Sequence, residues 1–143
     1  MANKRPRKNN VPRPRNGGTW TEAKYWGTLR SHIRNAFRYW IPMKQVKENA
    51  RRLNQSGFLT EKGRPYKWEF QCAHCKNWFP ERYEVDGKWR AAVEIDHVVP
   101  AGSFNCYEDV VPFIKRLTEE SLEAYQLLCR ECHRAKTNKE KSE

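Results

Sequence analysis

The sequence contains no run of about 18 apolar residues, the length that a membrane-spanning helix requires. Its basic N-terminus is followed by no apolar segment, so neither a signal peptide nor a membrane anchor is expected. It also has no internal repeat, and only 38% of its residues are hydrophobic. For a chain of 143 residues these features predict one soluble domain with tails, located in the cytoplasm.

Acidic residues are scarce in the first half of the chain. Residues 1–68 carry 17 Lys and Arg residues against only Glu22, Glu48 and Glu61, whereas the remainder carries 14 acidic and 11 basic residues. The net charge of +11 is therefore concentrated in the N-terminal half. Lys and Arg side chains near phosphates release condensed counterions, and carboxylates bind cations. The pattern predicts a polyanion-binding segment joined to a metal-binding one.

Residues 1–18 contain three prolines and six basic residues but no acidic or aromatic residue, so we expect a disordered basic arm. A helix should follow from Thr19. Its apolar face is predicted from residues at helical spacing, namely Trp26, Leu29, Ile33, Phe37 and Trp40.

Arginines recur every fourth residue on another face of this helix, at Arg30, Arg34 and Arg38. A solvated face and a phosphate-contacting face are both consistent with that stripe. A second helix is predicted from Pro42 towards Gly57, with Met43, Val46, Ala50 and Leu53 facing inward. Four further cations, Lys44, Lys47, Arg51 and Arg52, would enlarge the positive surface. Residues 19–67 are thus predicted to be a basic helical hairpin and linker.

Short β-prone stretches occupy residues 68–99, and Asp86-Gly87 predicts a tight hairpin turn. A short helix is expected within 107–118, and a final helix from Cys129 or Cys132 to about Lys141. The predicted fold class is therefore α+β, with residues 68–143 as one domain.

Four of the five cysteines form two Cys-x-x-Cys pairs, Cys72/Cys75 and Cys129/Cys132, separated by 53 residues. Two such pairs complete the tetrahedral coordination of zinc, and the gap means that the ion would join distant parts of the chain. One pair would suffice for a redox dithiol, so we predict a structural Zn²⁺ site with reduced thiols. His74 is expected to be exposed, and Cys106 to be a small core or loop residue.

Asp96 and His97 end a predicted strand, and His133 follows the second cysteine pair at the start of the last helix. A carboxylate can hold a hard divalent cation, while a neutral imidazole can remove a proton from water. These residues suit phosphodiester hydrolysis. Arg134 and Lys136 lie on the same helix and are candidates for phosphate contacts.

The combination Asp96-His97-x-x-Pro100 followed by Leu-Leu-Cys-x-x-Cys-His-x-x-Lys-Thr resembles the HNH endonuclease family over residues 70–138. That resemblance implies a ββα-metal core, with Asp96 and His133 binding Mg²⁺ or Mn²⁺ and His97 as the general base. The segments beginning at Trp20 and at Tyr107 are similar to small HNH proteins of tailed bacteriophages. This second resemblance implies that the protein is located in the host cytoplasm. It also implies that phage packaging proteins, besides DNA, are candidate partners.

The middle asparagine of that family is replaced by Ala124, and alanine lacks the amide that would steady the loop carrying the base. Asn105 is one candidate substitute. The departure leaves two rivals to a nuclease open: a zinc-stabilised nucleic-acid-binding module without catalysis, and an assembly factor that acts through protein contacts.

Overall fold

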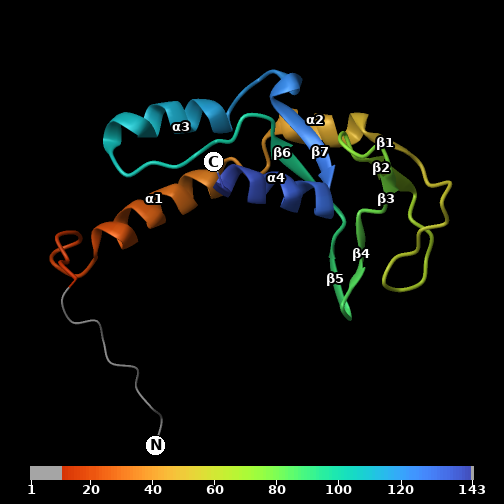
Figure 1. Cartoon of the computed structure of the whole chain (residues 1–143), viewed down its shortest axis with the longest axis horizontal. Coiled ribbons are helices and arrows are strands. Elements are labelled where there is room, and N and C mark those ends of the chain that lie inside the picture. The colour runs from red at the N-terminus through yellow and green to blue at the C-terminus, as the bar shows by residue number, and fades with distance from the viewer. Residues whose placement is uncertain (1–10, 143) are drawn as a thin grey trace, which may run out of the picture. The chain divides into compact units, whose positions relative to one another are not determined.

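The structure is a computed structural model that describes residues 11–142 (Figure 1). Contacts divide the chain into two compact units. Among the described residues, unit 1 contains residues 11–38 and Gly102–Leu117, and unit 2 contains Tyr39–Ala101 and residues 118–142. Helices and small antiparallel sheets are both present, which confirms the predicted α+β class. Within residues 11–142, no helix has the length and apolarity needed to cross a membrane.

Unit 1 is built on α1 (Glu22–Ala36), the turn η1 (Tyr107–Asp109) and α3 (Val110–Leu117). The Thr21 side chain accepts a hydrogen bond from the Lys24 backbone N–H at 3.1 Å, which caps the start of α1. Trp26 is buried, and its ring meets Phe104 edge to face at 6.0 Å; Phe104 meets the fully buried Phe113 at 5.0 Å. These aromatic pairs form the core of unit 1.

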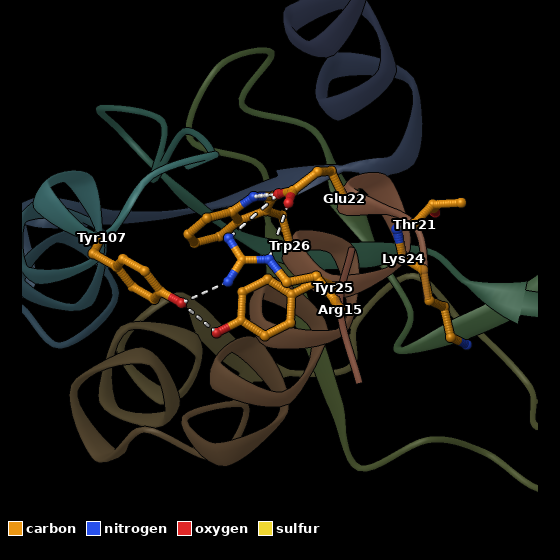
Figure 2. A network of polar contacts seen from close by, with 7 residues as sticks. All are labelled: Arg15, Thr21, Glu22, Lys24, Tyr25, Trp26 and Tyr107. Atoms are coloured by element: carbon orange, nitrogen blue, oxygen red, sulfur yellow. Dashed lines mark hydrogen bonds and ion pairs between the residues drawn. The ribbon is translucent and has the colours of Figure 1, made fainter. Parts of the chain in front are cut away.

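Arg15 lies at the centre of a polar network within unit 1 (Figure 2). Its guanidinium group stacks on the Tyr25 ring at 4.3 Å and donates hydrogen bonds to Glu22 at 3.0 Å and to the Tyr107 hydroxyl at 3.2 Å. The backbone of Arg15 also pairs with Trp20. The predicted disordered arm therefore does not extend through residues 15–18, because aromatic partners from elsewhere in the chain hold Arg15. Residues 1–10 of that prediction lie outside the described part.

Unit 2 begins with α2 (Ile41–Asn49), whose second residue is the buried Pro42. The prediction that this helix continues through Leu53 is wrong. Ala50 caps the helix, and Arg51–Leu53 form strand β1, which pairs antiparallel with β2 (Trp68–Gln71). β3 (Trp78–Phe79) completes a three-stranded sheet. Sheet pairing thus satisfies the backbone of residues 51–53 in place of a further helical turn. Because α1 and α2 belong to different units, their packing as a hairpin stays a prediction.

The Asp86-Gly87 turn prediction is confirmed. β4 (Arg82–Val85) and β5 (Lys88–Ala91) form a two-stranded hairpin in which Val85 pairs with Lys88. Asp86 and Gly87 both have positive φ, 51° and 76°, as a type I′ turn requires.

β5 leads through the buried Ala92 into β6 (Val93–His97), which pairs antiparallel with β7 (Tyr125–Cys129). The turn η2 (Leu122–Ala124) precedes β7, and α4 (Arg130–Ser142) follows it directly. In Figure 1, α4 runs beside the β6–β7 pair, and the two elements are in contact. The predictions of a helix within 107–118 and of a final helix to about Lys141 are confirmed.

β7 is buried on both faces and joins two parts of the unit 2 core. Leu127 packs with Phe70 and Val93, whereas Leu128 packs with Cys72 and Cys129. One strand therefore connects the three-stranded sheet to the cysteine cluster.

Candidate functional site

The four cysteines of the two Cys-x-x-Cys pairs come together in unit 2. Their sulfur atoms all lie within 4.8 Å of one another, and the Sγ atoms of Cys75 and Cys129 are 4.0 Å apart. Sulfurs bound to one tetrahedral zinc at 2.3 Å stand about 3.8 Å apart, so the cluster has the size of a zinc site. The cysteines are not joined by disulfides. The predicted grouping is confirmed, and these residues could hold a metal ion such as zinc.

The first pair is held against the second by backbone hydrogen bonds. Lys76, with a positive φ of 63°, donates from its N–H to the Cys72 carbonyl, which closes the turn of the first pair. Ala73 donates to the Leu127 carbonyl at 2.8 Å, which fastens that turn to β7. The second pair spans the end of β7 and the first turn of α4. His74 is exposed, as predicted.

The thiols differ in acidity before any metal is considered. Burial raises the pKa of the Cys72 thiol, but backbone hydrogen bonds from residues of both pairs outweigh it and lower that pKa to about 7. Burial and contacts with neighbouring sulfurs raise the pKa of Cys132 to about 12. Cys72 is therefore more ready than Cys132 to meet a cation as a thiolate.

Cys106, the fifth cysteine, is separate from the cluster. It is half-buried in unit 1, and its thiol donates to the Asp109 carboxylate at 3.2 Å.

A second group of polar side chains lies on β6, β7 and α4. Asp96 on β6 is mostly buried and uses its two oxygens differently. Oδ2 accepts hydrogen bonds from Gln126 at 3.1 Å and from Lys136 at 2.6 Å, whereas Oδ1 lies 3.5 Å from Nε2 of His133. The two residues that the family resemblance assigns to one cation, Asp96 and His133, are 37 residues apart in the sequence and lie close together in the structure.

His133 is held from its other side by Glu94. The Nδ1 atom of His133 lies 2.9 Å from Oε2 of Glu94, which is a good hydrogen-bond distance. If Nδ1 carries the proton, the lone pair on Nε2 points towards Oδ1 of Asp96. Sequence reasoning missed Glu94, although its position two residues before Asp96 on one strand places both side chains on the same face.

His97 ends β6 opposite Tyr125, and the two rings meet edge to face at 5.1 Å. Its Nε2 atom is shielded from solvent. The backbone at this position is fixed twice: Lys136 donates to the His97 carbonyl at 2.7 Å, and the Val98 N–H donates to the Ala124 carbonyl at 2.9 Å. The chain after His97 is thus anchored by the backbone of residue 124, which does not depend on an asparagine side chain there.

Asn105, considered above as a substitute for that asparagine, has another partner. Its side-chain oxygen accepts a hydrogen bond from Arg30 at 2.9 Å within unit 1.

The arginines of the α1 stripe contact other parts of the protein, which neither the solvated-face nor the phosphate-contact interpretation predicted. Arg30 donates to the Phe104 carbonyl at 2.6 Å, and Arg34 donates to the Gly102 carbonyl at 2.7 Å and stacks on Phe113. These two arginines connect α1 to the segment before α3. Arg38 lies beyond the end of α1. Contacts of the stripe with DNA stay a prediction.

The other predicted DNA-contacting cations also have neighbours. Arg52 pairs with the fully buried Glu69 at 2.7 Å and stacks on Trp78 at 3.7 Å, and Arg51 stacks on Trp68 at 4.2 Å. Lys44 lies 4.0 Å from Glu48, and Lys136 is engaged by Asp96. Arg134 is exposed on α4. Arg52 and Lys136 therefore have structural partners, so their positive charge is largely neutralised within the protein.

Comparison of the chain with protein-family models, with curated proteins and with solved structures finds no match.

Proposed function

We propose that this protein is a metal-dependent endonuclease of the HNH type that hydrolyses phosphodiester bonds in DNA. In this proposal β6, β7 and α4 form the ββα-metal core, and the four cysteines bind a structural zinc ion that joins β7 and α4 to the turn after β2. The observation that carries the proposal is the approach of Asp96 Oδ1 to His133 Nε2 at 3.5 Å, with Glu94 on the opposite nitrogen.

The 3.5 Å separation argues for a shared cation. A charged hydrogen bond between an imidazolium and a carboxylate is about 2.7–2.9 Å long, shorter than the distance observed. A neutral imidazole whose lone pair faces a carboxylate oxygen is repelled unless a cation lies between them. Two ligand atoms bound to one small divalent ion at about 2.1 Å stand roughly 3 Å apart, so a small adjustment would bring both into coordination.

The remaining contacts suit these roles. Glu94 would hold the His133 ring in the tautomer that presents Nε2, as carboxylates behind metal-bound histidines do. Lys136 and Gln126 both donate hydrogen bonds to Oδ2 of Asp96, so that the other oxygen, Oδ1, faces His133. A Mg²⁺ or Mn²⁺ ion bound there would supply positive charge to the pentavalent phosphorus and the departing 3′ oxygen.

In the proposed reaction, His97 removes a proton from the water that attacks phosphorus in line. Because Nε2 of His97 is shielded from solvent, its Nδ1 atom would be the acceptor. The bond from phosphorus to the 3′ oxygen breaks, which leaves a 5′ phosphate and, after protonation, a 3′ hydroxyl. Lys136 and the Val98–Ala124 hydrogen bond would keep His97 in place during this step.

A second function has a specific observation in its favour. Lys136 lies 2.6 Å from Asp96 and already neutralises the carboxylate that would bind the cation. Together with Ala124, this contact suits a zinc-stabilised module that binds nucleic acid without cutting it. A role as an assembly partner in phage packaging is compatible with either function.

The test is cleavage of supercoiled plasmid by the purified full-length protein in Mg²⁺, in Mn²⁺ and without a divalent cation. We expect metal-dependent nicked or linear DNA from the parent, at least a hundredfold less from His97→Ala, and parental activity from the control His32→Ala, whose ring is exposed on α1. If the folded, zinc-loaded parent bound the plasmid and left it intact in every metal, the binding module would replace the nuclease.

A further inference from the structure

A hollow of about 370 Å³ lies in unit 2, lined by residues of the 59–66 loop and of the β4–β5 hairpin. Three cations face it, Lys62, Arg64 and Arg82, together with the aromatic rings of Tyr66 and Trp89. Glu61 is the one carboxylate among its lining residues. None of these residues belongs to the metal-binding groups described above.

The hollow has well-defined walls. Leu59 pairs with Pro65 across the loop, Thr60 donates to the Arg64 carbonyl at 2.7 Å, and Gly63 closes the turn with a φ of 78°. The Tyr66 hydroxyl then donates to the Arg82 carbonyl at 3.3 Å, which fastens the loop to β4. Tight backbone bonding within the loop and its link to the hairpin fix both walls with respect to each other.

The three cations of the hollow outnumber its one carboxylate, Glu61, and none of them forms an ion pair within the described residues. The Arg82 guanidinium donates instead to the neutral Trp89 carbonyl at 3.0 Å. Arg52 and Lys136, by contrast, each have a carboxylate partner within 2.7 Å. Cations without acidic partners beside aromatic rings are suited to phosphates and to the stacking of bases.

We propose that this hollow binds the backbone of the DNA substrate at a distance from the cleavage site. The cations would contact phosphate oxygens, and Trp89 would offer its ring to a base or sugar. This assignment rests on the proposed function, which supplies DNA as the ligand, and it adds a binding site outside the residues that cut.

The chain itself limits how far this contact lies from the cut. Trp89 on β5 and Asp96 on β6 are seven residues apart in nearly continuous strand. An extended chain of that length spans at most about 25 Å. At about 3.4 Å per base pair this Cα separation corresponds to roughly seven base pairs, and with the added reach of the side chains the hollow would contact phosphates within about one helical turn of the scissile bond.

The experiment measures DNA binding by fluorescence anisotropy, with the zinc-loaded full chain and a labelled duplex in buffer without added Mg²⁺ or Mn²⁺. The double variant Lys62→Gln/Arg64→Gln removes two charges at the hollow. The control Lys24→Gln/Lys115→Gln removes two charges from exposed positions on α1 and α3. All four substituted side chains are exposed, so both proteins should retain their zinc content and circular dichroism.

We expect the hollow variant to bind about tenfold more weakly and the slope of log K against log salt to fall by about 1.8, or about 0.9 for each lost phosphate contact. The single variants should each lower the slope by about 0.9. The control should keep the parental slope. Equal affinity and slope in the two double variants would overturn the proposal.

The two proposals fail in different ways. If the hollow variant loses DNA binding but the parent cuts no plasmid in any metal, the proposed DNA-binding role of the hollow is supported and the proposed nuclease activity is rejected. If the parent cuts DNA and the hollow variant binds and cuts DNA like the control, the nuclease proposal is supported and the hollow is not part of the DNA-binding surface.

Discussion

Glu94 contacts His133 at the candidate site although it belongs to no recognisable motif. Only its hydrogen bond to His133, 2.9 Å long, distinguishes it from other exposed acidic residues on strands. The same reasoning applies to Arg30 and Arg34, whose regular spacing indicated a solvated or DNA-contacting face. Their acceptors are carbonyls more than 65 residues away in the chain, which no local pattern can reveal.

At this scale we predict that Glu94→Gln weakens Mn²⁺ binding about tenfold and that Glu94→Ala weakens it by ten- to a hundredfold. Glutamine still offers an oxygen to the His133 Nδ1–H but no longer polarises the ring, whereas alanine removes the acceptor. Titration calorimetry of the zinc-loaded protein with Mn²⁺ measures this without requiring cleavage. Glu84→Gln, an exposed change of equal charge on β4, is the control; equal Mn²⁺ affinities in all variants would contradict the role given to Glu94.

At the scale of elements, predictions from local sequence patterns were correct where neighbouring residues stabilise the structure. They were wrong where pairing with a distant strand competes with the local preference. The Asp86-Gly87 turn forms because both residues adopt the positive φ of a type I′ turn. Ala50 and Leu53 continue the helical spacing of α2, yet Leu53 pairs with Trp68 in a sheet. Pairing with β2 outweighs the small helical preference of three residues, two of which are arginines.

The hairpin and α1 allow a matched comparison of two glycines. Gly87 has a φ of 76° with open space where a Cβ would lie, so Gly87→Ala should destabilise the protein by about 1 kcal/mol through backbone strain alone. Gly27 lies inside α1, where a Cβ would meet only the end of the Arg30 side chain at 3.7 Å. Gly27→Ala should therefore stabilise by about 0.5–1 kcal/mol.

Urea unfolding followed by circular dichroism measures both changes. A Gly87→Ala protein with the parental midpoint would show that the hairpin adopts a different turn in solution, and an unchanged midpoint for Gly27→Ala would show that α1 does not limit stability.

At the scale of the whole molecule, the cysteine cluster holds together segments that are far apart in the chain. Cys72 follows β2, and Cys129 ends β7, so an ion bound between them would close a long loop of unit 2. Structural zinc binding contributes about 10–16 kcal/mol, which is as large as the whole stability of a typical domain. The fold of unit 2 is therefore expected to depend on the metal.

We predict about one zinc ion per parental chain, and loss of cooperative unfolding when a strong chelator removes it. Cys75→Ser should lose most of the zinc and most of the stability of unit 2, because three sulfurs leave the tetrahedral site incomplete. Cys106→Ser is the control, since its thiol contacts Asp109 and not the cluster. Metal analysis and thermal melts decide; a Cys75→Ser protein that keeps both zinc and parental stability would rule out a four-cysteine site.

The sequence by itself determined the features that depend on short spacings: the cysteine pairs, the tight turn, the last helix, and the separation of a basic half from the half that contains the cysteine cluster. The family resemblance placed Asp96 and His133 on one cation, and the structure brings their side chains to 3.5 Å. Tertiary structure alone decided where α2 ends, that Glu94 stands behind His133, that Lys136 neutralises Asp96, and that Arg30 and Arg34 connect α1 to the segment before α3. The physical reason is that a turn or a cysteine pair is fixed by neighbouring residues, whereas a hydrogen bond between distant segments forms only when the packed core brings them within about 3 Å.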